Sequence, residues 1–348
     1  MDLSAKITGI QYKPLLCRKL KTVDFKDFEK ALAKKATFIL KITPDHKLAV
    51  SCWVSPKRTR SYPYARVYDT LGFTGKKITI IPVIKDEGKR GDRDFLQWDT
   101  ISLMSLLGVY VIIAHYTDAK RSRRYRHKIT NQRFDVDYLK KEIKRLLSYQ
   151  SDALHWNIEQ TDRVGKIAQK ALDVYNKISK KLKVEMHSKD SAEKRIQQLL
   201  KGKRAFMTLS RELAKKAQRR ESLTIQPKER LNGTKATITI ENYLGGYYYF
   251  TSDEVEIKNK NVYLVEGKHS RTNSLLSLED IKDGLLKMIL FTNLKNIKID
   301  SKSYKPISVL KLTIEKGFRS DKITKSQKRV LDILKKEAKI NGFKIRII

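Results

Sequence analysis

Residues 250–270 read FTSDEVEIKNKNVYLVEGKHS and predict a β-hairpin. Two runs of alternating apolar residues flank a short polar segment, which is the usual pattern of two strands joined by a tight turn. A turn of two residues and a turn of four give the same register, with Ile257 opposite Val262. Counting outward from that pair, Asp253 faces Glu266 across the hairpin.

This register brings charged side chains together. Directly opposed residues have Cβ atoms about 5 Å apart on one face of a sheet, and Lys268 shares the face of Glu266 because it lies two residues further along the strand. Two carboxylates this close repel each other unless a cation lies between them, and a divalent metal ion is a common solution. The alternative is a solvated strand end, because Glu-x-Lys triplets are frequent in a chain with 75 Lys and Arg.

The residues after the hairpin predict a helix and a further strand. Ser277 and Asp280 form a capping box ahead of apolar residues at helical spacing in 278–289. The strand-like residues 297–299 come next. The expected order is therefore hairpin, helix, strand.

At these positions the sequence resembles the PD-(D/E)xK nuclease superfamily, and in particular type II restriction endonucleases. In that family an acidic residue opens the second strand, Glu/Asp-x-Lys closes the third, and a helix then packs on the sheet. By resemblance Asp253 and Glu266 bind metal and Lys268 is catalytic. The sequence departs from the pattern at Ser252, where the family often has Pro. The preceding helix often carries a further acidic ligand, which here is open between Glu212, Glu221 and Glu229.

The resemblance implies Mg²⁺-dependent hydrolysis of DNA phosphodiester bonds. Asp253, Glu266 and the carbonyl oxygen of Gly267 would hold one Mg²⁺ ion, or two, with Mn²⁺ as a substitute, because oxygen ligands suit these ions better than zinc. Lys268 would orient and help to deprotonate the attacking water, with its pKa lowered by burial beside the metal. The resemblance also implies a homodimer and a cognate DNA methyltransferase encoded in the same operon.

The charge of the chain favours a nucleic-acid partner. The formal net charge is +37 in 348 residues, and the basic residues are spread over the whole sequence. Such a surface binds phosphate backbones through counterion release. The alternative is a Lys-rich composition shared by a whole proteome, and composition does not distinguish DNA from RNA.

The cysteines and the apolar runs indicate the cellular compartment to expect. Cys17 and Cys52 are the two cysteines of the sequence, which imply no disulfide framework and fit a reducing cytoplasm. The longest apolar run, residues 106–114, is too short to span a bilayer. We therefore expect a cytoplasmic protein with no membrane partner.

The order of strand-like and helix-like patterns predicts three regions in an α/β (α+β) protein. Residues 1–134 are expected to form an α/β domain with a role in DNA recognition, and residues 135–221 a helical connector. Residues 222–348 are expected to form the nuclease domain, a restriction-endonuclease-like mixed sheet flanked by helices. The strands expected in the first region are 37–42, 48–54, 77–84 and 109–115, and its helices are 24–34 and 95–107.

Two basic segments are candidates for DNA contact. Residues 53–66 mix basic and aromatic side chains in a Pro-containing loop, and residues 120–128 form a denser cationic run. Arg and Lys contact phosphates and guanine edges, and Tyr stacks or binds phosphate. The alternative for both segments is a solvated basic surface. The candidate residues are Lys57, Arg58, Arg60, Tyr62, Arg66, Arg121, Arg123, Arg124 and Arg126.

Residues 82–100 concentrate acidic side chains and are a rival for the active site. Asp94 or Asp99 would be the ligands there. No acidic-x-Lys triplet follows in the strand-like residues 109–115, and Asp99 or Thr100 suits the first position of a helix. A loop that caps a helix is therefore favoured, and a recognition or regulatory role stays open.

Three classes of function remain after these observations. The leading one is a sequence-specific DNA endonuclease, whose recognition sequence cannot be read from the residues. The second is a structure-specific or repair nuclease, which the long stretch ahead of the nuclease region disfavours. The third is a non-catalytic basic nucleic-acid-binding protein, which predicts no dependence on metal or on Glu266.

Overall fold

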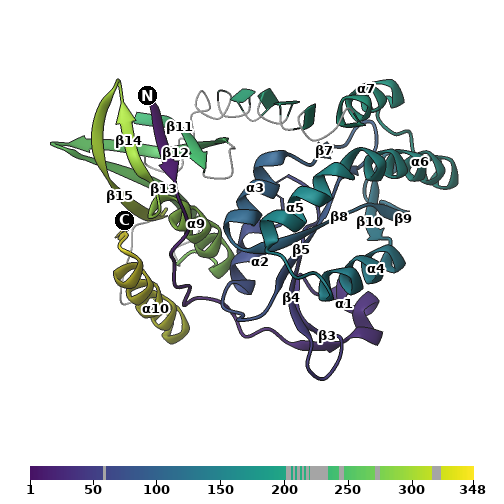
Figure 1. The fold of residues 1–348 in the computed structure, drawn as a ribbon, viewed down its shortest axis with the longest axis horizontal. Helices are drawn as coiled ribbons and strands as arrows, with labels where there is room; N and C mark the ends of the chain where they lie inside the picture. The colour runs from purple at the N-terminus through teal and green to yellow at the C-terminus, as the bar shows by residue number, and fades with distance from the viewer. Residues whose placement is uncertain are drawn as a thin grey trace. The chain divides into compact units, whose positions relative to one another are not determined.

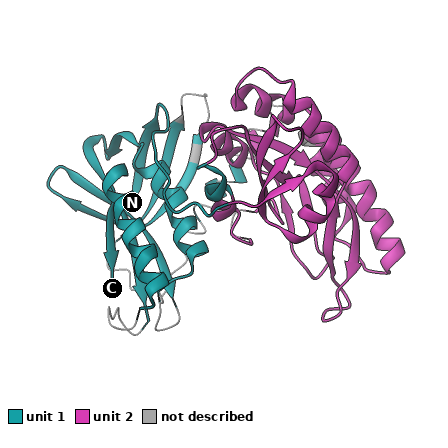
Figure 2. Cartoon of the chain, turned by 90° about the horizontal axis from the view of Figure 1, so that it is seen from below, with its two compact units in different colours: residues 1–19, 67–72, 211–348 teal, residues 20–66, 73–210 magenta. Residues whose placement is uncertain are grey.

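The computed structural model describes residues 1–57, 60–200, 205–206, 208–209, 212–213, 215–216, 219, 234–242, 247–270, 275–315 and 323–348. These residues form a mixed α/β structure (Figure 1), as expected. The chain divides into two compact units (Figure 2). Unit 1 comprises residues 1–19, 67–72 and 211–348, and unit 2 comprises residues 20–66 and 73–210.

The two units differ from the predicted division into 1–134, 135–221 and 222–348. Residues 2–7 fall within the predicted N-terminal domain, but they form strand β1 (Asp2–Ile7), which is parallel to β11 (Thr234–Asn242) in the sheet of unit 1. Its apolar residues Leu3, Ala5 and Ile7 are all buried. The predicted connector helices as far as residue 200 belong to unit 2, and residues of the first two of them are part of the apolar core on its sheet.

The seven strands of unit 1 form one mixed sheet in the order β13-β12-β11-β1-β14-β15-β16. Strand β13 also pairs with β15, in parallel, so the pairings through β11, β12, β13, β15, β14 and β1 return to their start. The sheet is therefore a closed circuit of six strands with β16 added to β15. The remaining strands are β12 (Tyr247–Lys258), β13 (Asn261–Ser270), β14 (Lys295–Ile299), β15 (Lys302–Ile314) and β16 (Lys344–Ile347).

Helix α9 (Leu278–Phe291) follows β13 and packs on β13 and β15, as the apolar spacing predicts. Its N-cap is Ser277, whose hydroxyl accepts the backbone N–H of Asp280 at 3.1 Å. Helix α10 (Lys325–Asn341) begins with a capping box at Thr324 and ends at Gly342, whose φ of 72° is in the left-handed region that favours glycine.

A buried polar cluster joins α9 to two distant segments of unit 1. The ammonium group of Lys282, whose side chain is 1% exposed, lies 2.6 Å from Oδ1 of the equally buried Asp69. Oδ2 of Asp69 also accepts from Nε of Arg18 at 2.8 Å. Residues 67–72 and the N-terminal segment thereby share one ionic centre with α9.

Unit 2 contains a five-stranded sheet in the order β2-β3-β4-β5-β8, in which only β3 and β4 are antiparallel. Its four long strands and its helices α1 and α3 correspond to predicted elements within a few residues. The N-cap of α3 is Gln97, so the prediction of Asp99 or Thr100 as the N-cap was wrong by two or three residues. The elements are β2 (Thr22–Asp24), β3 (Thr37–Lys41), β4 (Lys47–Cys52), β5 (Lys77–Pro82), β8 (Val109–Ala114), α1 (Phe28–Lys34) and α3 (Trp98–Leu106). Helix α2 (Pro63–Thr70) is divided between the units, with residues 63–66 in unit 2 and residues 67–70 in unit 1.

Four further helices follow in the described part of unit 2: α4 (Val136–Leu147), α5 (Ala153–Asp162), α6 (Val164–Leu182) and α7 (Lys189–Leu200). Helix α4 adds its apolar face to the core formed by α1 and the sheet. Helix α5 covers β8, where the Asn157 side chain accepts the N–H of Val111 at 2.6 Å and donates to the carbonyl of Val109 at 3.0 Å. These bonds satisfy backbone groups of a strand that would otherwise have a free edge.

Two small sheets complete unit 2. One joins β6 (Ile84–Asp86) to β7 (Arg93–Phe95), and the other joins β9 (Tyr116–Arg121) to β10 (Ile129–Phe134). The predicted cationic run thus forms the turn of a strand pair. No helix in the described residues is long and apolar enough to cross a membrane.

Candidate active site

The hairpin of β12 and β13 has the predicted register. Ile257 lies opposite Val262, and the two-residue turn is made by Asn259 and Lys260. Asn259 has a φ of 56°, a left-handed conformation that Asn tolerates better than most residues. Because the ladder continues outward as far as the pair of Glu254 and Val265, residue 253 reaches the level of Glu266.

Glu266 is the buried centre of the site. Its side chain is 2% exposed, and its two carboxylate oxygens meet two ammonium groups. Oε1 lies 3.1 Å from Nζ of Lys268, and Oε2 lies 2.6 Å from Nζ of Lys287 on α9. Burial alone would raise the pKa of Glu266, but Lys287 and Lys268 outweigh it and hold the pKa below its usual value.

Asp253 lies beside Glu266, as predicted. Its Oδ2 accepts the backbone N–H of Gly267 at 2.8 Å, and its carboxyl group is close enough to Glu266 to help lower the pKa of that residue. Two carboxyl groups in contact share a proton or bind a cation, because two bare negative charges repel each other at this distance. Asp253, Glu266 and Lys268 are therefore in one place, at the point where β12 begins to pair with β13.

Lys268 does not have the environment expected of a base. Its ammonium group lies between Glu266 and Asp283 of α9, 2.7 Å from Oδ2 of Asp283. Burial lowers the pKa of Lys268, but the two carboxylates outweigh this effect and raise the pKa well above its usual value. This raised pKa comes from the protein groups alone, so the expectation of a pKa lowered beside a bound metal ion stays a prediction.

The sequence interpretation missed Asp283 and Lys287. They are one helical turn apart and so share a face of α9, on a helix whose other buried residues are apolar apart from Lys282. A charged pair at this spacing within the apolar pattern was a usable sign of a polar site under the helix. Its partners on β13 are evident only once the helix is placed on the sheet.

The donor set suits a hard divalent cation. Mg²⁺ is usually held by one or two carboxylates together with substrate phosphate and water, and Asp253, Glu266 and the Gly267 carbonyl supply oxygen donors only. Within the described residues no group of three or more His, Cys, Asp or Glu could hold a metal ion. Among the described residues, Asp253 and Glu266 are then the two carboxylates that this site could offer to a metal ion. Of the acids suggested as a further ligand, Glu212 is exposed, and Glu221 and Glu229 lie outside the described residues.

Comparison with protein-family models, with curated proteins and with solved structures finds no match to this chain. The likeness to PD-(D/E)xK nucleases therefore depends on residues 253–268 and on the geometry around them.

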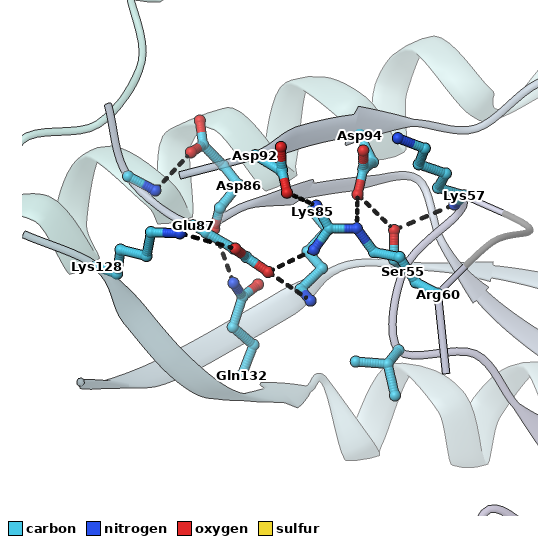
Figure 3. Close-up of polar contacts among 12 residues, drawn as sticks. Ser55, Lys57, Arg60, Lys85, Asp86, Glu87, Asp92, Asp94, Lys128 and Gln132 are labelled. Carbon is cyan, nitrogen blue, oxygen red and sulfur yellow. Dashed lines mark hydrogen bonds and ion pairs between the residues drawn. The ribbon is translucent and has the colours of Figure 1, made fainter. Parts of the chain in front are cut away.

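The rival acidic segment of unit 2 forms a salt-bridge cluster around Arg60 (Figure 3). The guanidinium group contacts Glu87 at 2.7 Å, Asp94 at 2.9 Å, and also Asp92. Asp94 further accepts from the hydroxyl of Ser55 at 2.8 Å. Three carboxylates are thus bound by a cation of the chain itself, which favours the structural interpretation of this loop.

The candidate DNA-binding residues of 57–66 have unequal access to a ligand. The side chain of Arg60 is 19% exposed and is bound to the acidic cluster, which argues against its predicted contact with DNA. Arg66 donates to the carbonyl of Cys52 at 2.6 Å and is half-buried. Lys57 and Tyr62 are exposed, and Arg58 lies outside the described residues.

The arginines of the second segment are all accessible. Arg121, Arg123, Arg124 and Arg126 are exposed at the end of the β9–β10 pair. Of the two basic segments, residues 120–128 therefore offer the better surface for a polyanion.

Proposed function

We propose that this chain is a Mg²⁺-dependent, sequence-specific endonuclease of the PD-(D/E)xK type, which hydrolyses phosphodiester bonds of double-stranded DNA. The observation that carries the proposal is the meeting of Asp253, Glu266 and Lys268 under α9. A buried ionic cluster is weak evidence for a role in stability, since apolar residues of similar size often serve as well. Ionisable groups with strongly shifted pKa values more often mark functional sites.

The connections around the site support the same proposal. Strands β11, β12 and β13 are followed by α9, which packs on β13, and then by β14 and β15. The resemblance implies the first part of this order, a run of strands that ends in Glu-x-Lys and a helix that then packs on the sheet. The restriction-endonuclease-like fold of unit 1 is part of the proposal.

Each side chain then has a definite task. Asp253, Glu266 and the Gly267 carbonyl would hold Mg²⁺, which when bound polarises a phosphate and lowers the pKa of a coordinated water. Lys268, oriented by Asp283, stabilises negative charge on the phosphate as a fixed cation. Lys287 neutralises the buried Glu266, so the carboxylate stays ionised within the sheet.

The direct test is incubation of the purified chain with phage genomic DNA of known sequence, with Mg²⁺ and with EDTA. We expect discrete fragments that require Mg²⁺, and their mapped ends would give the recognition site. A Mg²⁺-dependent smear would replace the sequence-specific enzyme by a structure-specific or nonspecific nuclease. Intact DNA in both conditions, with a strong gel shift, would replace it by a non-catalytic binding protein.

Asp283→Asn is expected to lower the cleavage rate by about 10- to 100-fold, the usual cost of losing a group that orients an active-site residue. Asn has the same shape but lacks the charge that holds Lys268 at 2.7 Å. Single-turnover cleavage rates measure the effect, with Glu279→Gln on the same helix as the matched control. Asp283→Glu should restore part of the rate. Equal rates for Asp283→Asn and the control would remove Asp283 from the site.

A further inference from the structure

The β9–β10 pair and its turn, residues 116–134, form a ribbon with a cationic outer surface, which we call the basic ribbon. Four of the six residues 121–126 are Arg, and Asp118 is the one acidic residue of the segment. Asp118 is already paired with Lys181 at 3.1 Å. The surface of the ribbon therefore carries a net positive charge that no acid of its own cancels.

The ribbon is held against the rest of unit 2 along β10, as far as the residue next to the turn. The rings of Tyr116 and Phe134 stack with centroids 4.4 Å apart, and Ile129 is buried. The N–H of Ile129 donates to the carbonyl of Glu87 at 3.0 Å, and the Gln132 side chain donates to the carbonyl of Asp86 at 2.7 Å (Figure 3). One side of the strand pair is thus held, while its charged residues are exposed.

The tip of the ribbon has a defined conformation of its own. The N–H of Ser122 donates to the carbonyl of Lys128 at 2.9 Å, and Nε of Arg121 donates to the carbonyl of Arg126 at 2.8 Å. The guanidinium group of Arg124 lies over the exposed ring of Tyr125, 5.2 Å from its centroid. A tip that is ordered before binding loses little conformational entropy when it binds.

The shape and the choice of cation point to one kind of partner. The major groove of B-DNA, roughly 12 Å wide, admits a two-stranded ribbon, whereas the major groove of duplex RNA is too narrow and deep. Lys would suffice for phosphate contact and is the commoner cation in this chain, yet the tip is built from Arg. The planar guanidinium binds O6 and N7 of guanine through two hydrogen bonds, which Lys cannot reproduce in the same geometry.

We propose that the basic ribbon enters the major groove of double-stranded DNA, where Arg123, Arg124 and Arg126 recognise guanine. The ribbon is then the element that reads sequence, and not only a contact to phosphate. This inference rests on the proposed function in one respect, the choice of double-stranded DNA as substrate.

The experiment replaces Arg by Lys, which changes the shape of the cationic group and keeps its charge. Wild-type chain and the variant Arg123→Lys/Arg124→Lys/Arg126→Lys each select ligands from a random DNA duplex library in EDTA, so that no result depends on cleavage. We expect the wild type to enrich a guanine-containing motif and the Lys variant to enrich none. Replacing guanine by 7-deazaguanine in the selected duplex should weaken wild-type binding about tenfold, because it removes the N7 acceptor.

Two controls test whether sequence recognition depends on the arginines of the ribbon, and not on arginines elsewhere or on total charge. Arg90→Lys/Arg329→Lys changes exposed arginines outside the ribbon and should select the wild-type motif. Binding of a fixed random-sequence duplex should have the same salt dependence for all three proteins, since their charges are equal. An unchanged motif in the ribbon variant, no motif from the wild type, or tighter binding to duplex RNA would each overturn the inference. Failure of the proposed cleavage would leave these binding results as they are.

Discussion

Glu266→Gln is expected to reduce Mg²⁺-dependent cleavage by at least about a thousandfold, since the charge lost at the metal site is worth several kcal/mol in the transition state. Gln preserves the size of a side chain that is 2% exposed, and Lys268 keeps Asp283 as its partner. DNA binding in EDTA should be unchanged or tighter, because a negative charge has left the phosphate site. Single-turnover cleavage and gel shifts measure the two effects separately.

Glu254→Gln is the matched control for this variant. Glu254 is also 2% exposed on the same hairpin and is paired with a buried lysine, Lys311, at 2.9 Å. Lys311 lies opposite Gly267 in register, and therefore on the other face of the sheet from Glu266. Loss of stability should be similar in the two variants, but cleavage should fall only in Glu266→Gln. Near-normal cleavage by Glu266→Gln would refute the assignment of the active site.

Asp69→Ala is expected to lower the free energy of unfolding of unit 1 by about 3–5 kcal/mol, the usual cost of leaving one member of a buried ion pair without its partner. Lys282 would then hold an ammonium group in a site that is 1% exposed. Hydrogen exchange measured peptide by peptide is a suitable probe. It should show faster exchange in the strands of unit 1 and not in unit 2.

The tryptophans give an internal reference for this experiment. Trp53, Trp98 and Trp156 are the three tryptophans of the chain, and all belong to unit 2. Tryptophan fluorescence should therefore keep its urea midpoint in Asp69→Ala. The double variant Asp69→Leu/Lys282→Met should recover most of the lost stability, since apolar residues often replace a buried pair without cost. Unchanged hydrogen exchange in Asp69→Ala would mean that the Asp69–Lys282 pair makes no measurable contribution to the stability of unit 1.

Local patterns in the sequence predicted the parts of the structure that depend on neighbouring residues. The period of two along residues 255–265 set the hairpin register, and this register brought Asp253 to Glu266. The capping box at Ser277 and the apolar spacing after it predicted α9. Each of these features is decided within about twenty residues, where periodicity and turn chemistry are sufficient.

Features that depend on distant partners were not predicted. The alternation in residues 2–7 indicates a strand, but nothing in those residues names β11 as its partner. Arg60 looked like a DNA contact because its three acidic partners come from a loop about thirty residues away, which only the fold brings to it. The raised pKa of Lys268 depends first on Glu266, which the hairpin register places beside it, and then on Asp283, a residue of the next helix that the register does not reach.

The position of β1 has a consequence for the order in which the protein is made. This strand is synthesised before the other elements of unit 1, but it pairs with residues 237–242 and with β14, which ends at Ile299. At usual rates of translation the gap is roughly 15 to 60 seconds, during which all of unit 2 is synthesised. Unit 2 can fold while Leu3, Ala5 and Ile7 still lack the neighbours that bury them. A deletion of the first seven residues would therefore damage the sheet that carries Glu266, at the opposite end of the chain.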